Sequence, residues 1–450
     1  MDEFEAVVEE IAARVVPDTE ERERLAGVAG RVLAAAEAAV DDLPVAADVV
    51  QVGSTARGTW VSGDRDIDVF VRFPPDLPRA DLERYGLQVG RAVLPDGHEE
   101  YAEHPYVKGT VEGFDVDLVP CYRVADATDI QSAVDRTPFH DAYLSARLDA
   151  DLAREVVLTK AFLKGIGVYG SDLRTKGFSG YLTELLVLAY GDLRSFLAAA
   201  CDWRPPVELD PEAHGRRSFD DPLVVVDPTD PERNVAAVCS TDNVARLVHH
   251  ARVFLADPTV ERFDPPAPTP LDAERMAAEL DRRGTTPFAL RFDAPDLVDD
   301  QLYPQLEKSL AGVAGELDRQ GFDVLRAAAF ADETAVLFVE CEVAARPAVA
   351  RHDGPPVWVG GHAAGFYDKY AESGDVYGPF VDGARYVVER ERDHATARSW
   401  LESDALFGVS LGVRVEDALR EGYEVLGGEE TVALAGEFGA DLARYFDPRP

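Results

Sequence analysis

The sequence predicts a multidomain α+β protein, and three observations support this fold class. Segments with alternating polar and apolar residues, such as 66–73, are typical of strands, whereas 152–166 has the apolar spacing of a helix. Strand-like segments gather in two parts of the chain, with a mainly helical part between them. Finally, 450 residues are enough for roughly three domains, and a proline-rich stretch at 259–270 marks the clearest boundary.

We therefore divide the chain into four parts: residues 1–135, 136–258, 259–345 and a small β-rich tail at 346–450. Hydrophobic residues make up 46% of the sequence, so we expect a globular protein. No apolar run approaches the roughly 20 residues that span a membrane, and the acidic N-terminus lacks the basic start of a signal peptide. The four scattered cysteines argue against a zinc site and fit a cytoplasmic location.

The chain is strongly acidic, with 84 acidic residues, 45 basic residues and a formal net charge of −39. Such a surface repels nucleic acid at low salt, because phosphate binding normally depends on basic patches. The acidic residues are spread through every segment, which favours a halophilic protein over one with an acidic tail. In molar salt the Debye length falls to about 3 Å, so local arginines can still hold RNA.

Two helices are expected first. Residues 3–15 have amphipathic spacing and end before Pro17. Asp18 and Glu21 form a plausible capping box for a second helix at about 20–42. We expect both helices to cover a sheet and assign them no chemistry.

The segment 43–135 predicts a small α/β unit around a sharp turn. An apolar run ends at Val52, and Gly53-Ser54 then forms a turn whose backbone N–H groups can approach a phosphate. The other elements expected here are a helical segment at 55–60, a strand at 66–73, a helix at 79–94 and strands at 106–112 and 114–119.

Two of these strands carry pairs of aspartates. Side chains two residues apart on a strand share a face, so Asp66 and Asp68 point the same way, as do Asp115 and Asp117. Clustered carboxylates repel one another unless a cation lies between them, and Mg²⁺ prefers oxygen ligands. Asp66 and Asp68 are therefore candidate metal ligands. Either Asp115 or Asp117 completes a set of three, and the spacing alone does not choose between them.

Residues 136–258 are expected to be mainly helical. Lys160 and Lys164 lie four residues apart on one helix of a lysine-poor chain, so a nearby anion should offset them. We expect Lys164 to face solvent or RNA. The other elements expected here are an apolar helix at about 181–188, an extended segment at 220–228 and a helix at 241–255.

Beyond the proline-rich stretch the sequence predicts a second α+β unit. Its expected elements are a strand at 287–292, a helix at 299–319 and strands at about 322–328 and 334–342. Small units of this kind often bind RNA through a sheet face, although fold alone does not prove it. The tail is rich in aromatic and glycine residues with interspersed basic residues, which indicates either a compact core or a platform for RNA.

Three motifs relate the chain to a known family. They are Gly53-Ser54 followed by Asp66-x-Asp68, the run Asp117-Leu118-Val119-Pro120-Cys121-Tyr122, and Lys176-Gly177-Phe178-Ser179-Gly180-Tyr181 with the apolar helix that follows. The first is the signature of polymerase-β-like nucleotidyltransferases. Together they resemble the archaeal, class I CCA-adding enzymes, nearly from end to end. The resemblance implies a nucleotidyltransferase head, a helical neck, a ferredoxin- or RRM-like body and a tail.

The resemblance also implies a reaction. It is the template-independent, stepwise addition of C, C and A from CTP and ATP to the 3′ end of tRNA, with release of pyrophosphate. It selects Asp117 as the third carboxylate beside Asp66 and Asp68, with two Mg²⁺ ions per active site. Members often carry Glu at the first position of the pair, where this chain has Asp66, and we expect the shorter side chain still to bind Mg²⁺.

Seven residues are expected to bind the incoming nucleotide. Ser54 and Arg57 follow the sharp turn and are expected at the triphosphate. The resemblance assigns the triphosphate and ribose to Thr137, His140, Lys160 and Tyr169, and the base to Arg233. An arginine fork can satisfy acceptors on C or A, whereas U and G present a different edge.

The implied partners are ATP, CTP and tRNA, the last held at its acceptor stem, TΨC arm and 3′ end by the body and tail. The sequence does not decide whether the protein forms a homodimer. Two alternative functions remain. One is another RNA nucleotidyltransferase of the poly(A)-polymerase type, which use of CTP as well as ATP would exclude. The other is a degenerate RNA-binding protein, which the loss of one carboxylate would favour.

Overall fold

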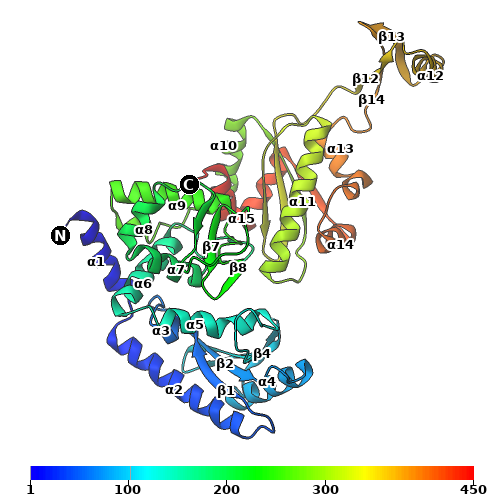
Figure 1. Ribbon diagram of the computed structural model, residues 1–450. Helices are drawn as coiled ribbons and strands as arrows, with labels where there is room; N and C mark the ends of the chain where they lie inside the picture. Colours follow the sequence, from blue (N-terminus) through cyan, green and yellow to red (C-terminus); the bar gives the residue numbers. More distant parts are fainter. Residues whose placement is uncertain (1, 102) are drawn as a thin grey trace. The chain divides into compact units, whose positions relative to one another are not determined.

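The computed structural model describes residues 2–101 and 103–450, which form two compact units (Figure 1). The first unit comprises the chain up to Pro266 together with Pro450, and the second comprises Ala267–Arg449. The boundary between them lies inside the proline-rich stretch. The finer division into four parts remains a prediction. No helix in the described ranges is long and apolar enough to cross a membrane.

The first unit combines a mixed sheet with a helical bundle. Its helices are α1 (Glu3–Val15), α2 (Thr19–Asp41), α3 (Gly53–Arg57), α4 (Arg79–Val93), α5 (Thr137–Ser145), α6 (Ala150–Gly165), α7 (Gly180–Tyr190), α8 (Leu193–Ala200) and α9 (Thr241–Ala256), with short 3₁₀ turns at Ala133–Arg136 and Val260–Arg262. Its strands are β1 (Asp48–Val52), β2 (Asp66–Phe73), β3 (His98–Tyr101), β4 (Pro105–Val111), β5 (Phe114–Tyr122), β6 (Val207–Leu209), β7 (Leu223–Asp227) and β8 (Asp230–Asn234).

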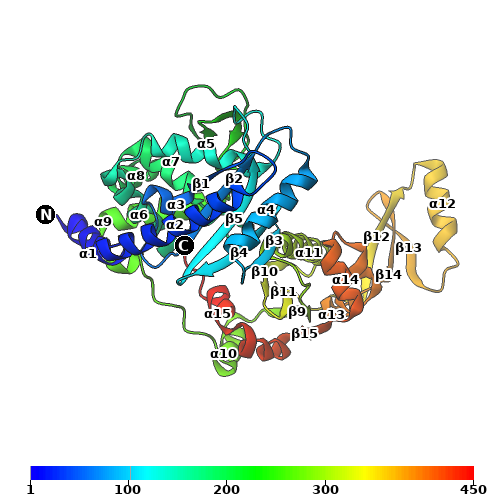
Figure 2. The same cartoon turned by 90° about the horizontal axis from the view of Figure 1, so that it is seen from below.

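The larger sheet of the first unit, which we call the head sheet, has the strand order β1-β2-β5-β4-β3. Strands β2 and β5 are parallel, and the other neighbours are antiparallel. Alternation along β2 sends Ile67, Val69 and Val71 into a core that they share with side chains of α2 and α4. Figure 2 shows these two helices beside the sheet. The opposite face carries Asp66 and Asp68. This face is therefore the one left for chemistry.

A second core holds the helical part of the same unit together. It gathers side chains from α1, α6, α7, α8 and α9, including the rings of Phe162, Phe196 and Phe254. The start of α6 is capped by Asp149, whose side chain accepts from the N–H of Leu152 at 2.9 Å. The short strands β6, β7 and β8 form a small separate sheet beside these helices.

The second unit is built on a four-stranded antiparallel sheet with the order β10-β11-β9-β15. Its strands are β9 (Thr286–Asp293), β10 (Val324–Ala331), β11 (Thr334–Cys341), β12 (Val349–Pro356), β13 (Val376–Asp382), β14 (Arg385–Glu391) and β15 (Glu424–Gly427). Its helices are α10 (Ala273–Arg283), α11 (Asp299–Gln320), α12 (Gly360–Tyr370), α13 (Ala397–Leu401), α14 (Val413–Glu421) and α15 (Ala435–Phe446), with 3₁₀ turns at Asp404–Gly408 and Gly428–Leu434. One face of the sheet packs on α11, α13 and α14, and the other on α10 and α15.

The tail differs in part from its prediction. Only the three-stranded sheet β12-β14-β13, which α12 accompanies, is the expected β-rich structure. The chain after Glu391 is mainly helical, and β15 adds a strand to the body sheet by pairing with β9. This pairing joins residues more than a hundred positions apart in sequence, which local periodicity does not report.

Candidate active site

The strand register places four aspartates on one face of the head sheet. In the parallel pair β2–β5, Asp66 lies opposite Asp115 and Asp68 opposite Asp117. Residues two apart on each strand share a face, so the strand register alone places these four aspartates together. The structure thus brings together all the carboxylates that the sequence singled out.

Gly53 allows the turn before α3 to approach this carboxylate face closely. Its φ of +84° lies in the left-handed region that favours glycine. A Cβ added at Gly53 would collide with Oδ2 of Asp68. The Gly-Ser turn and the first carboxylate pair therefore belong to one site, as the sequence motif indicates.

The charges at this site are incompletely balanced by protein groups. Burial, together with the nearby charges of Asp117 and Asp66, raises the pKa of Asp68 to about 6. Burial also raises the pKa of Asp117. Among the described residues, the Oδ1 atom of Asp117 is buried without a hydrogen-bond partner, and it lies 3.4 Å from Nζ of Lys108 in an ion pair.

These carboxylates fit a hard divalent cation. In the part of the chain that the structure describes, no three His, Cys, Asp or Glu side chains are already gathered around one metal position. The register nevertheless aligns Asp66, Asp68 and Asp117, and one of their oxygens is buried without a hydrogen bond. A bound cation would offset both the burial and the repulsion that raise the pKa of Asp68, and oxygen donors are what Mg²⁺ prefers.

Asp115 differs from Asp117 in its surroundings. It is exposed, and its Oδ1 accepts a hydrogen bond from Oγ1 of Thr110 at 3.1 Å. Asp117 is more enclosed and opposes Asp68 directly. This difference favours Asp117 as the third ligand, and the assignment remains a proposal.

Arg57 lies in a buried ionic network that the sequence did not predict. Its Nε and NH2 groups donate to Glu184 at distances of 2.8 to 3.1 Å, and its NH1 group pairs with Asp141. Glu184 also accepts from Oγ1 of Thr59. Lys160 lies nearby and donates from Nζ to the carbonyl of Thr59 at 2.9 Å, and burial lowers the pKa of this lysine. The network ties α3 to α5, α6 and α7, and the expected phosphate contacts of Arg57 and Lys160 remain predictions.

Two of the other residues expected at the triphosphate lie on these helices, and Tyr169 lies in the segment after α6. Ser54 is half-buried in α3, and Thr137 begins α5. Burial raises the pKa of Tyr169, and Nζ of Lys164 lies 5.4 Å above the ring of that tyrosine. The anion expected near the lysine pair is Asp64, whose carboxylate lies 3.0 Å from Nζ of Lys164.

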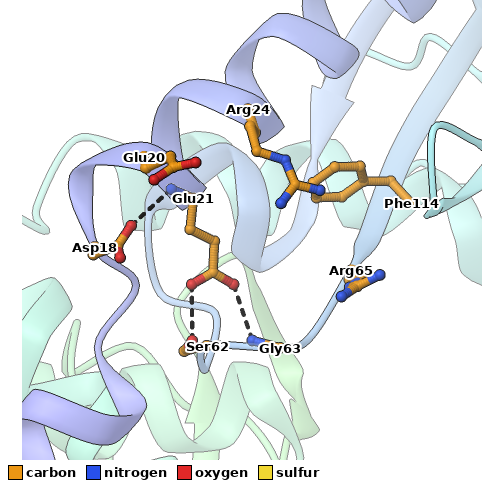
Figure 3. Close-up of a pocket in the computed structure, with 8 residues that line it drawn as sticks. All are labelled: Asp18, Glu20, Glu21, Arg24, Ser62, Gly63, Arg65 and Phe114. Carbon is orange, nitrogen blue, oxygen red and sulfur yellow. Dashed lines mark hydrogen bonds between the residues drawn. The ribbon is translucent and has the colours of Figure 1, made fainter.

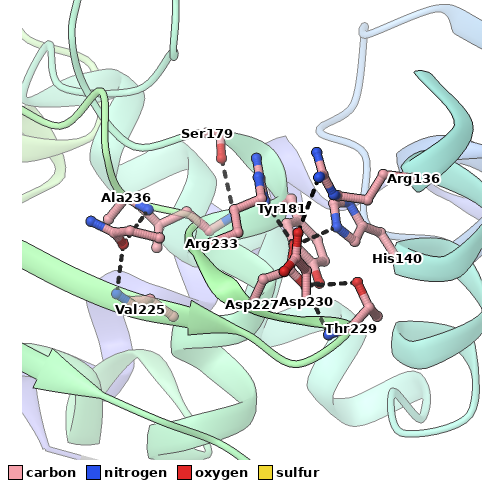
Figure 4. Close-up of polar contacts among 12 residues, drawn as sticks. Arg136, His140, Ser179, Tyr181, Val225, Asp227, Thr229, Asp230, Arg233 and Ala236 are labelled. Carbon is pink, nitrogen blue, oxygen red and sulfur yellow. Dashed lines mark hydrogen bonds and ion pairs between the residues drawn. The ribbon is translucent and has the colours of Figure 1, made fainter. Parts of the chain in front are cut away.

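His140 and Arg233, from α5 and β8, meet at one carboxylate (Figure 4). Nε2 of His140 and NH1 of Arg233 each lie 2.8 Å from Oδ2 of Asp227, which has no exposed side-chain surface. The ring of His140 stacks on Tyr181 with centroids 3.8 Å apart. Burial alone would raise the pKa of Asp227, but hydrogen bonds from His140 and Thr229 outweigh it and hold that pKa well below its ordinary value.

Sequence reasoning missed three residues that organise this region. Glu184 lies within a family motif but in an apolar helix, where packing is the simpler interpretation. Asp227 closes an apolar strand, a place where a turn residue is common. Lys108 was detectable, because it is one of few lysines in the sequence and lies on a strand expected beside the aspartates.

A separate pocket opens beside α2 in the same unit (Figure 3). It is lined by Asp18, Glu20, Glu21, Arg24, Ser62, Gly63, Arg65 and Phe114. Glu21 accepts from Oγ of Ser62 at 2.8 Å and from the N–H of Gly63 at 2.9 Å. These bonds fasten the loop before β2 to α2. No predicted site residue lines this pocket, so we assign it a structural role.

Three family models match successive parts of the chain. They are the nucleotidyltransferase domain over residues 34–140, the second domain of tRNA nucleotidyltransferase over 154–264 and the C-terminal domain of the CCA-adding enzyme over 283–428. The matched ranges include the carboxylate face, the helices around Arg57 and the body sheet.

Curated relatives are similar over the whole chain. The CCA-adding enzyme of Haloarcula marismortui is 61% identical, and that of Halobacterium salinarum strain NRC-1 is 62% identical; both alignments cover 100% of this chain and of the relative. The CCA-adding enzyme of Methanosarcina barkeri is 42% identical over 92% of each chain.

Proposed function

The chain belongs to the family of CCA-adding enzymes, and we propose that Asp66, Asp68 and Asp117 hold the Mg²⁺ ions of its active site. It is a tRNA nucleotidyltransferase that adds C, C and A to the 3′ end of tRNA. The observation that carries the site assignment is the β2–β5 register, which aligns the three carboxylates beside the Gly53 turn.

The arrangement suits in-line phosphoryl transfer, which requires positioning and charge neutralisation more than a side-chain nucleophile. When bound, two Mg²⁺ ions would activate the terminal hydroxyl of the acceptor and stabilise the leaving pyrophosphate. Asp68 lies against the Gly-Ser turn, and Asp66 lies two residues away on the same strand face. Asp117 faces Lys108, whose ammonium group offsets part of the negative charge.

We propose that the triphosphate binds at the turn that begins α3 and at the helices α5 and α6. Ser54, Thr137 and Tyr169 present hydroxyl groups, and Arg57 and Lys160 supply positive charge. The pairing of Arg57 with Glu184 and Asp141 fixes its guanidinium plane in advance, which reduces the entropy lost on binding a phosphate.

The base of CTP or ATP is assigned to Arg233, with His140 beside it. The side chain of Arg233 is 34% exposed, so its outer end remains available to a ligand. We propose that the body and tail hold the acceptor stem and TΨC arm of tRNA. Exposed aromatic side chains between β12 and β14 support this assignment; they include Trp358, Tyr367, Tyr377 and Phe380.

The test of this function is incorporation of labelled nucleotides into tRNA that lacks its 3′ end, in molar KCl with Mg²⁺. Reactions contain CTP alone, ATP alone or both. We expect two C residues with CTP alone, and a final A only after both C residues are present. Addition of A alone, repeated along the acceptor, would contradict the function and favour an enzyme of the poly(A)-polymerase type.

A further inference from the structure

A buried carboxylate lies behind two of the residues assigned to the nucleotide. Asp227 ends β7, and its side chain has no exposed surface. We propose that Asp227 is a positioning residue that fixes Arg233 and His140 for the incoming nucleotide and thereby maintains the selection of C and A. This inference rests on the nucleotide site proposed above.

The two carboxylate oxygens of Asp227 have different partners (Figure 4). Oδ1 accepts from the N–H of Thr229 at 2.9 Å, from its Oγ1 at 2.8 Å and from the hydroxyl of Tyr181 at 3.3 Å. Oδ2 accepts from Nε2 of His140 and from NH1 of Arg233, both at 2.8 Å. One oxygen therefore shapes the turn between β7 and β8, and the other holds the two side chains.

The bond to Oδ2 fixes the direction of the Arg233 fork. A guanidinium group carries its five N–H donors in one rigid plane, so holding one end orients the rest. The Arg233 side chain is also 34% exposed, so it is not enclosed by the protein. Discrimination between base edges requires the donors to stay within about 10–20° of the productive geometry. Without Asp227, the fork would sample other orientations and accept other bases more readily.

The same oxygen also selects the form of His140. A carboxylate only accepts hydrogen bonds, so the Nε2 atom bonded to it carries a hydrogen. Stacking on Tyr181, at an interplanar angle of 14°, holds the ring plane. Together these contacts leave Nδ1 as the ring nitrogen available to the nucleotide. Asp227 thus holds one side chain from α5 and one from β8 in fixed positions relative to each other.

A matched control lies on the same hairpin. Oδ1 of Asp230 accepts from the N–H of Glu232 at 3.0 Å, and its Oδ2 pairs with NH2 of Arg136 at 3.1 Å. As in Asp227, one oxygen of Asp230 therefore accepts from a backbone N–H and the other binds an arginine. Within the described ranges, Asp230 forms no hydrogen bond with His140 or Arg233.

The experiment compares wild type, Asp227→Asn and Asp230→Asn as full chains in molar KCl with Mg²⁺. The asparagine keeps one oxygen for the turn but replaces Oδ2 with an amide that cannot accept from Arg233. We measure the Kd for CTP, and KM and kcat for CTP, ATP and UTP. In Asp227→Asn we expect the Kd for CTP to rise about tenfold and the preference for CTP over UTP to fall by about the same factor. Asp230→Asn should stay within about twofold of wild type.

A second comparison separates positioning from folding. If Asp227 acts through Arg233, then adding Asp227→Asn to Arg233→Gln should change the CTP preference by less than about twofold, because the effects of coupled residues do not add. An unchanged preference in Asp227→Asn would overturn the inference, as would equal losses in both aspartate variants. Failure of wild type to add C or A would instead refute the proposed function, whereas the Kd ratios for CTP would still test the positioning role.

Discussion

At the scale of single residues, Gly53 is the position where the backbone most tightly constrains the candidate site. A methyl group there would need the space of Oδ2 of Asp68, and the positive φ adds strain for any other residue. The carboxylate would then have to leave the position that its strand provides. The tolerance of a catalytic site for such displacements is small.

We predict that Gly53→Ala lowers the rate of CMP addition by about a hundredfold, because shifts near 1 Å have effects of that size. Gly63→Ala is the control. Gly63 has a φ of +90°, and among the described residues no heavy atom lies within 4 Å of the position of an added Cβ. Both variants should lose roughly 1 kcal/mol of stability, measured by denaturant unfolding, while only Gly53→Ala loses activity. Equal activity in the two would contradict the close approach.

The candidate site was predictable where it depends on local pattern. Asp66 and Asp68 share a face because strand geometry alternates, and Gly53 follows an apolar run. Glu184 and Asp227 were not predictable in this way. Glu184 binds Arg57, which lies 127 positions away in sequence, and Asp227 binds His140, which lies 87 positions away. A local sequence pattern does not report contacts over such separations.

At the scale of elements, Glu184 links α7 to the turn that carries Arg57. Its side chain is 1% exposed and that of Arg57 is 8% exposed, so removing one charge leaves the other buried. We predict that Glu184→Gln lowers the free energy of unfolding by about 3 kcal/mol, measured by denaturant titration in molar KCl. Asp141→Asn should cost less, because Asp141 is more exposed. The reverse order would show that Asp141 is the main partner of Arg57.

Glu340 joins β11 to α10 and α15. Burial alone would raise its pKa, but hydrogen bonds from Arg283, Thr285 and Tyr445 outweigh burial and lower that pKa. A carboxylate whose pKa is lower in the folded state stabilises the fold above its unfolded pKa, about 4.3 for Glu, and loses this contribution as pH falls through the folded value.

We therefore predict that the stability of wild type falls more steeply below about pH 4.3 than that of Glu340→Gln. Unfolding midpoints of both proteins between pH 7 and pH 3, at constant high salt, measure this difference. Glu342→Gln, two residues along, is a suitable control because the side chain of Glu342 is exposed, and this variant should retain the wild-type slope. Parallel curves for wild type and Glu340→Gln would contradict the role of this carboxylate.

Many helices and strands could be predicted because their hydrophobic period is local. Two strands that the sequence did not predict, β8 and β15, have a common cause. β8 contains Pro231 and charged residues, which have little strand propensity, and it forms because β7 pairs with it. β15 is short and completes a sheet whose other strands lie far earlier in sequence. Such pairings depend on tertiary structure and not on the segment itself.

At the scale of the whole molecule, the net charge of −39 determines how the protein responds to salt. Repulsion among carboxylates destabilises the compact state at low ionic strength and also repels tRNA. We predict that the thermal midpoint rises by about 10 °C or more between roughly 0.1 M and 2 M KCl, as screening shortens the Debye length. Sucrose, which does not screen charge, should raise it less. Full stability and activity without added salt would contradict this account.

The central claim is that Asp66, Asp68 and Asp117 form one metal-dependent site for nucleotide addition. The most direct test measures Mn²⁺ binding by electron paramagnetic resonance, together with CMP and AMP addition to tRNA, in wild type, Asp117→Ala and Asp115→Ala. We predict that Asp117→Ala weakens Mn²⁺ binding and abolishes addition, whereas Asp115→Ala, on the same strand face, retains both. Loss of metal binding and activity in Asp115→Ala, with both retained in Asp117→Ala, would contradict the claim.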